Sequence, residues 1–101
     1  MPRAVHAEVK APLEALCSGE QIYFQKFATY ADVSGAVDIR STLAVEIGES
    51  ARRWIYSVHD VYASGFTAEA LGRDGTRVAR TVVTLRYVRG QALVWTVEKR
   101  H

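Results

Sequence analysis

The chain has few of the residues that usually reveal chemistry. It has a single cysteine, Cys17, which cannot form an internal disulfide or a thiolate metal cage and fits a small buried hydrophobe. Its three histidines, at positions 6, 59 and 101, lack the spacing of metal ligands. Its glycines are isolated at turns and do not form a phosphate-binding loop. We therefore expect no metal and no cofactor, and nothing in the sequence argues for an enzyme.

Long apolar runs are also missing. No stretch approaches the roughly 18 apolar residues that a membrane-spanning helix needs, so we expect no membrane partner. The first residues, MPRAVHAEVKAPLEAL, are interrupted by Glu8 and Lys10, which is not typical of a secretory signal. Together with the lone cysteine, this pattern predicts a cytoplasmic protein.

The composition indicates one globular domain spanning residues 1–101. Of the 101 residues, 49% are hydrophobic and 24% are charged, which leaves enough apolar surface for a core. The net charge of +2 is unevenly distributed, because residues 1–70 have a balance of −3 and residues 71–101 a balance of +5. Such asymmetry is usual on a solvated sheet face, and it can also indicate an anionic partner.

Two turn signals predict hairpins in the second half of the chain. Asp74-Gly75 suits a type I′ turn, and a two-residue loop there places Phe66 opposite Val83. Arg89-Gly90 predicts a second tight turn, which places Thr84 opposite Trp95. The resulting apolar face, which we assign to the core, carries Phe66, Ala68, Ala70, Ala79, Thr81, Val83, Leu85, Tyr87, Ala92, Val94 and Thr96.

A third hairpin is predicted around Ser34-Gly35. With those two residues as the loop, Ile22 faces Ile47 and Phe24 faces Val45, and one face of both strands is almost wholly apolar. A helix starting at the capping box of Ser18 to Gln21 is the alternative, but it does not explain why both segments sort in register.

The stretch from Ala51 to Ser64 fits both a helix and a strand. As a strand it would place Asp60 on the apolar face, whereas helical spacing forms one continuous apolar stripe capped by Ser50 and ended by Gly65. We therefore predict a helix. On a helix, His59 and Asp60 project toward solvent and do not face one another, so we predict no acid–base role for them.

The N-terminal region predicts a short helix from Pro12 to Gly19, with residues 3–9 as either a helix or an edge strand. The expected fold is α+β: an antiparallel sheet of about five strands built from hairpins, with one or two helices packed on its apolar face.

One surface of the C-terminal strands is the sequence's candidate binding site. The predicted two-residue turn gathers a tryptophan, apolar neighbours and a basic rim on the face opposite the core. These residues are Arg80, Arg86, Leu93, Trp95, Val97 and Lys99. The patch could be covered by another part of the chain, could form a self-association interface, or could bind single-stranded nucleic acid by stacking and phosphate contacts.

The C-terminal stretch RTVVTLRYVRGQALVWTVEKRH is also similar to the basic antiparallel strands of small ribonuclease toxins. The likeness covers less than a third of the chain, and the predicted first hairpin differs from the helix-rich start of those toxins. No site residue is carried over. The leading hypothesis is a small non-catalytic protein that acts as a homodimer or binds another protein. The alternative is a basic nucleic-acid-binding protein that uses the Arg/Trp face.

Overall fold

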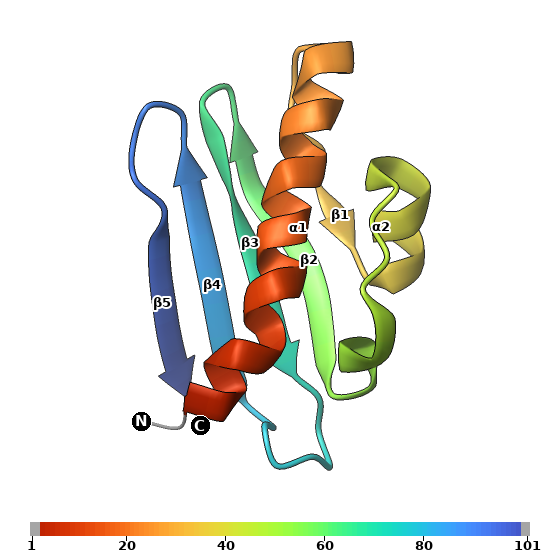
Figure 1. Cartoon of the computed structure of the whole chain (residues 1–101), viewed down its shortest axis with the longest axis vertical. Coiled ribbons are helices and arrows are strands. Elements are labelled where there is room, and N and C mark those ends of the chain that lie inside the picture. Colours follow the sequence, from red (N-terminus) through yellow and green to blue (C-terminus); the bar gives the residue numbers. More distant parts are fainter. Residues whose placement is uncertain (1–2, 100–101) are drawn as a thin grey trace.

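In the computed structural model, which describes the backbone of residues 3–99 and the side chains of residues 7–99, a long helix crosses a five-stranded antiparallel sheet (Figure 1). The strands follow one another in the sheet in the order β1-β2-β3-β4-β5. The predicted α+β class, with a sheet of five antiparallel strands and helices beside it, is confirmed. The elements in chain order are α1 (Arg3–Phe27), β1 (Val33–Ser34), α2 (Ala36–Leu43), the 3-10 turn η1 (Gly48–Arg52), β2 (Trp54–Tyr62), β3 (Gly65–Gly72), β4 (Thr81–Val88) and β5 (Val94–Lys99).

The first predicted hairpin is wrong, because α1 continues to Phe27 and takes up the first part of its first strand. Val9, Leu13 and Leu16 recur at helical spacing and are fully buried, which anchors this helix on the sheet. Residues 12–19 are helical as predicted, but the predicted ends at Pro12 and Gly19 are wrong, because both residues lie inside α1. Ile22, expected to be buried between strands, is 56% exposed.

The second predicted strand of that hairpin is also helical. Gly35 has a positive φ of 86°, and it turns the chain from β1 directly into α2. Ile39 and Leu43, which an extended chain would place on one face, are four residues apart and are both buried from α2. The alternating pattern therefore came from two amphipathic helices whose apolar residues happened to match in register.

The helix predicted from Ala51 to Ser64 is wrong as well, because residues 54–62 form strand β2. Trp54, Tyr56 and Val58 are buried in strict alternation, as expected for a strand with one face on the core. The charge that argued against a strand belongs to Asp60, and a bulge turns this side chain away from the apolar face. Asp60 has a φ of 53°, and the pairing with β3 shifts between His59 and Tyr62, so the side chain of Asp60 is 75% exposed.

The hairpin of β3 and β4 is confirmed in kind but not in register. Residues 73–80 form an eight-residue connection, so Phe66 pairs with Tyr87 instead of the predicted Val83. Because a shift of four residues is an even number, each side chain stays on the face of the sheet that was predicted for it. Phe66, Ala68, Ala70, Val83 and Leu85 are all fully buried in the core.

The pairing of β4 with β5 differs from the prediction by one residue. The Arg89-Gly90 turn does close, because the N–H of Gln91 donates to the carbonyl of Val88 at 2.9 Å. An extra residue before β5 then places Trp95 opposite Leu85 instead of Thr84. A shift of one residue moves every side chain of a strand to the other face. The prediction that Val94 and Thr96 point into the core is therefore wrong.

Candidate functional site

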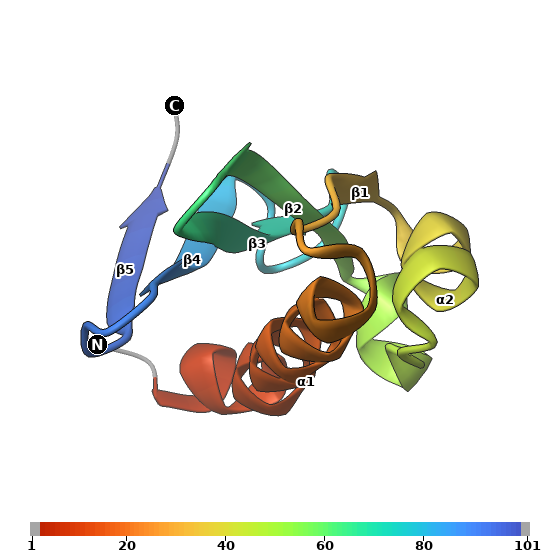
Figure 2. The same cartoon turned by 90° about the horizontal axis from the view of Figure 1, so that it is seen from above.

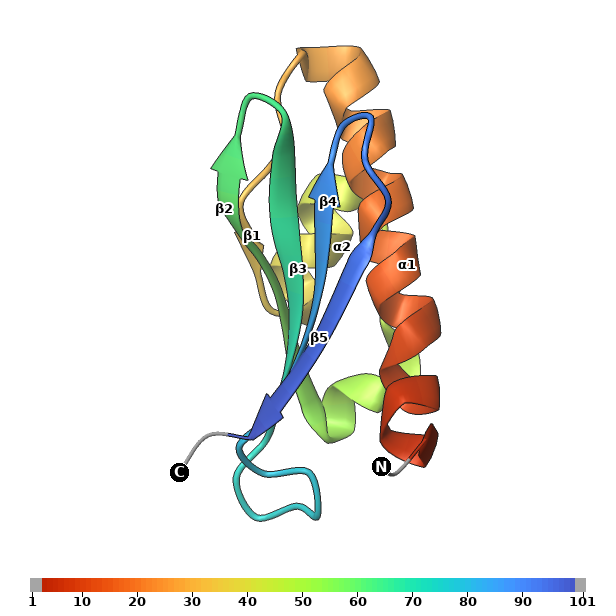
Figure 3. The ribbon, with the colours of Figure 1, turned by 90° about the vertical axis from the view of Figure 1, so that its left-hand side faces the viewer.

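Strand β5 forms an open edge of the sheet (Figure 3). It pairs with β4 on one side only, and all six of its residues are exposed. The opposite edge is formed by β1, which is only two residues long and is followed at once by α2. Short edge strands resist pairing with other chains, whereas a longer exposed edge offers a row of backbone donors and acceptors. Of the two edges, the one at β5 is therefore better suited to pair with another strand.

A groove lies between α1 and β5, on the helix side of the sheet. Helix α1 packs against β3 and β4, and β5 turns away from it (Figure 2). The groove has a volume of about 300 Å³ and is lined by Lys10, Val83, Trp95 and Val97. Trp95 and Val97 stay 39% and 38% exposed, because no other element among residues 3–99 covers them. The apolar side of β5 is thus accessible from solvent.

The structure divides the six residues of the predicted patch between different places. Trp95, Val97 and Lys99 share the helix side of the sheet with Val83, since their partners on β4 are Leu85, Val83 and Thr81. Arg86 pairs with Val94 on the opposite face. The prediction that the tryptophan and the arginines share a face is therefore wrong, because it depended on the register of one turn.

The remaining two members lie outside the strands. Arg80 ends the connection before β4 with a positive φ of 66°, and its side chain is exposed. Leu93 precedes β5 and is 43% exposed. Sequence reasoning missed Lys10 as a groove residue, because residues 3–9 and 12–19 were treated as separate elements. The helical spacing from Val9 to Leu16 was the signal that could have joined them.

On the other face of the sheet, His59 lies between two carboxylates. Its Nε2 is 3.0 Å from Glu69 Oε1, and its Nδ1 is 3.2 Å from Asp60 Oδ2. The prediction that His59 and Asp60 do not face one another is wrong, because the bulge at Asp60 turns its side chain toward the ring. A doubly protonated imidazole can donate to both carboxylates, whereas a neutral ring can donate to one.

This arrangement does not form a metal site or a nucleophile–base pair. The two carboxylates approach opposite nitrogens of His59, so the three groups do not converge on one point. Within residues 7–99, no group of three or more His, Cys, Asp or Glu could hold a metal ion. Glu69 lies at Nε2 and Asp60 at Nδ1, so both ring nitrogens of His59 face carboxylates instead of a hydroxyl or thiol. The side chains of His6 and His101 lie outside the described residues.

Cys17 is a buried side chain of α1, as predicted. It is 4% exposed, and burial raises the pKa of its thiol to about 12, with smaller contributions from Glu20 and Glu14. A thiol is nucleophilic only as the thiolate, so burial of Cys17 disfavours a nucleophilic role.

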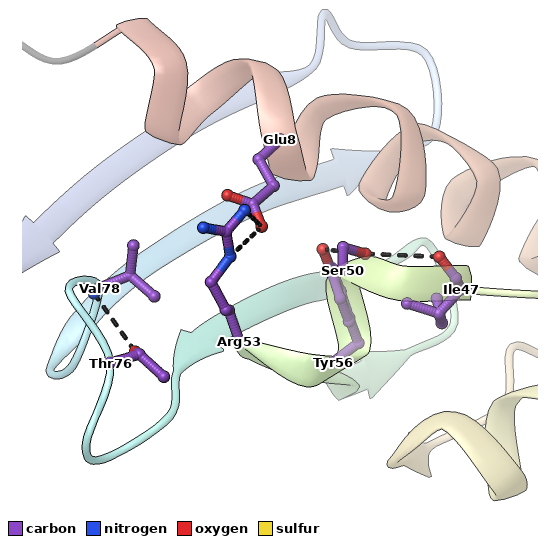
Figure 4. A network of polar contacts seen from close by, with 7 residues as sticks. All are labelled: Glu8, Ile47, Ser50, Arg53, Tyr56, Thr76 and Val78. Carbon is purple, nitrogen blue, oxygen red and sulfur yellow. Dashed lines mark hydrogen bonds and ion pairs between the residues drawn. The ribbon is translucent and has the colours of Figure 1, made fainter.

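A network of polar contacts lies near the start of β2 (Figure 4). Arg53 donates from Nε to Glu8 Oε1 at 2.9 Å, with its Nη2 at 2.8 Å from the same oxygen. Tyr56 donates to Ser50 Oγ at 3.1 Å, and burial raises the pKa of Tyr56 to about 12. The first contact joins the residue between η1 and β2 to α1, and the second joins β2 to η1, which indicates a structural role.

No protein-family model, curated protein or solved structure matches this chain. Over the part of the chain that the structure describes, no helix combines the length and apolar character needed to cross a bilayer.

Proposed function

We propose that this protein functions by self-association, and that β5 with its adjoining groove is the contact surface. One observation carries the proposal: large apolar side chains are concentrated and exposed at the open edge of the sheet. Within the described chain, nine large hydrophobic side chains are exposed, and four of them lie between positions 93 and 97. They are Leu93, Val94, Trp95 and Val97. Concentrated apolar exposure of this kind marks interaction surfaces on folded proteins.

The edge has few of the features that keep edge strands from pairing. Such features are proline, a bulge, a very short strand, or charges that point inward from the edge. β5 has no proline and pairs in unbroken register with β4 from Thr81 to Arg86. Its charged residues, Glu98 and Lys99, lie only at its end. The chemistry therefore suits β-strand addition, in which main-chain hydrogen bonds provide affinity and alternate side chains provide specificity.

Sedimentation velocity tests this proposal. We expect the mass of the wild type to rise from monomer toward dimer between ~10 µM and ~1 mM, the range expected for a small interface. Trp95→Ala should remain monomeric over this range. Ile22→Ala is the matched control, because it removes a side chain of α1 that is more exposed than Trp95 and is not among the residues that line the groove. It should associate like the wild type.

Salt distinguishes apolar association from attraction between charges. Association through Trp95 and Val97 should persist at ~1 M salt, where the Debye length falls to about 3 Å. A wild type that stays monomeric to ~1 mM would refute the proposal. Equal association of the wild type and Trp95→Ala would move the interface away from β5.

A further inference from the structure

We propose that the occupant of the β5 edge is a second copy of this chain, paired antiparallel about a two-fold axis through Thr96. The two five-stranded sheets would then form one continuous sheet of ten strands. This inference rests on the proposed function and adds the geometry of the contact.

Symmetry restricts the pairing to a few registers. A two-fold axis perpendicular to the sheet places β5 against itself antiparallel and keeps the helices of both copies on one side. Residues opposite each other in an antiparallel pair point to the same face, and faces alternate along a strand. The numbers of two opposed residues must therefore differ by an even number or be equal. One residue of β5 must lie on the axis and face its own equivalent.

Two positions keep five residues of β5 paired with the second copy, Thr96 and Val97. With Thr96 on the axis, Trp95 lies opposite Val97 of the second copy, and this apolar pair forms twice on the groove side. With Val97 on the axis, Trp95 instead lies opposite Lys99 of the second copy. Apolar cross-strand pairs and threonine–threonine pairs are both favourable, so the side chains favour Thr96.

The charges of the strand are compatible with this register. Pairing about Thr96 places Val94 opposite Glu98 of the second copy and Leu93 opposite Lys99. Two like charges directly opposite each other would be destabilising, and this register has no such pair. The strand can thus face a second copy of itself without opposing two like charges.

The helices leave room for the second copy. Neighbouring strands lie about 4.8 Å apart, so the β4 strands of the two copies would be about 14 Å apart across the new pair. A helix is about 10 Å wide with its side chains, and α1 packs over β3 and β4, further from the axis than β5. The two helices therefore do not collide. The space between them lies above Trp95 and Val97, which each copy would help to cover.

The contact is small, so the experiment must trap it. We expect one strand pair and two grooves to bury less than the ~800 Å² per partner of a stable interface, and therefore to form a weak dimer. Single cysteines on a Cys17→Ala background report the register, because a residue on the axis faces its own equivalent. We would compare Thr96→Cys with Val97→Cys and Val94→Cys, which lie on the same exposed strand.

The expected result is preferential disulfide formation by Thr96→Cys under mild oxidation. Directly opposed Cβ atoms in an antiparallel pair lie about 4.5–5.5 Å apart, close to disulfide geometry, and offset positions lie further apart. We expect Thr96→Cys to form dimer at least about ten-fold faster than either control at the same concentration. Circular dichroism of the reduced variants verifies that each is folded.

Each outcome has a separate meaning. Fastest dimer formation by Val97→Cys, or equal rates for all three variants, would overturn the Thr96 register while leaving self-association intact. Absence of Trp95-dependent association in sedimentation would overturn the proposed function itself. In the wild type, amide exchange in β5 should slow as concentration rises while exchange in β1 stays constant. Unchanged exchange in β5 in a sample that does associate would exclude strand pairing.

Discussion

The carboxylate of Glu20 accepts a hydrogen bond from the backbone N–H of Ala31 at 2.7 Å, although Glu20 is fully buried. This contact ties the middle of α1 to the segment that precedes β1. The second oxygen, Oε2, is buried without a hydrogen-bond partner among the described residues. Burial raises the pKa of Glu20 to about 7, the Ala31 hydrogen bond opposes this shift, and Asp32 adds to it.

Glu20→Gln should change how stability depends on pH. The folded pKa of about 7 exceeds the ordinary value of 4.5, so the folded state binds a proton more tightly than the unfolded state. The stability that the wild type gains from this tighter proton binding is fully present below pH 4.5 and is lost as the pH rises through 7. Glutamine can still accept from Ala31 and cannot ionise. We expect the free energy of unfolding of the variant, relative to that of the wild type, to rise by on the order of 2–3 kcal/mol when the pH is raised from 4.5 to 8.

Urea denaturation at both pH values measures this change. The amide of glutamine leaves buried N–H groups near the place of Oε2, which adds an offset that does not depend on pH. Only the difference between the two pH values therefore matters. A stability difference that is the same at pH 4.5 and pH 8 would show that Glu20 titrates like an exposed carboxyl.

Gly72 is the glycine whose replacement should cost most. An added Cβ would lie 1.7 Å from the carbonyl oxygen of Val78, which is backbone and cannot move aside as a side chain can. We expect Gly72→Ala to lower the free energy of unfolding by on the order of 3 kcal/mol or more. Gly75→Ala, in the connection that follows β3, has a positive φ of 82° but open space around its Cβ, so it should cost about 1 kcal/mol. Thermal unfolding of both variants compares them, and equal losses would contradict the close approach of the loop.

The Arg53–Glu8 contact should contribute modestly and depend on salt. Their side chains are 50% and 20% exposed, so water screens the interaction in part. A double-mutant cycle with Arg53→Met and Glu8→Gln should give a coupling of ~0.5–1 kcal/mol at low salt, falling at ~1 M salt. Chemical denaturation measures it. A coupling near zero at low salt would show that the residues act independently.

Local alternation predicted β3 and β4 correctly, because their faces depend only on the parity of the register. The connection of residues 73–80 is longer than the Asp74-Gly75 turn suggested, yet the shift of four residues left Phe66 and Leu85 in the core. The shift of one residue before β5 had the opposite effect and moved Trp95 to the groove. A single residue in one loop, which turn preferences do not determine, thus decided where the candidate site lies.

In the first half of the chain, helices were predicted as strands and a strand was predicted as a helix, for a different reason. The segment around Val58 matches both periodicities, and the bulge that turns Asp60 outward depends on pairing with β3, which the local sequence does not show. The full length of α1 is hard to predict from the sequence, because Pro12 is an unusual residue inside a helix. Tertiary burial of Val9, Leu13 and Leu16 outweighs that local cost.

The two tryptophans should report directly on whether the groove is covered. Trp54 is fully buried, whereas Trp95 is 39% exposed. At ~10 µM, where we expect monomer, acrylamide should quench only the emission of Trp95, and Trp95→Phe should leave a shielded emission from Trp54 alone. At ~1 mM the accessible fraction in the wild type should fall, because pairing of β5 covers Trp95. Ile22→Ala should show the same loss of accessibility as the wild type. If quenching of the wild type is identical at both concentrations, Trp95 remains open to solvent and does not lie in an interface.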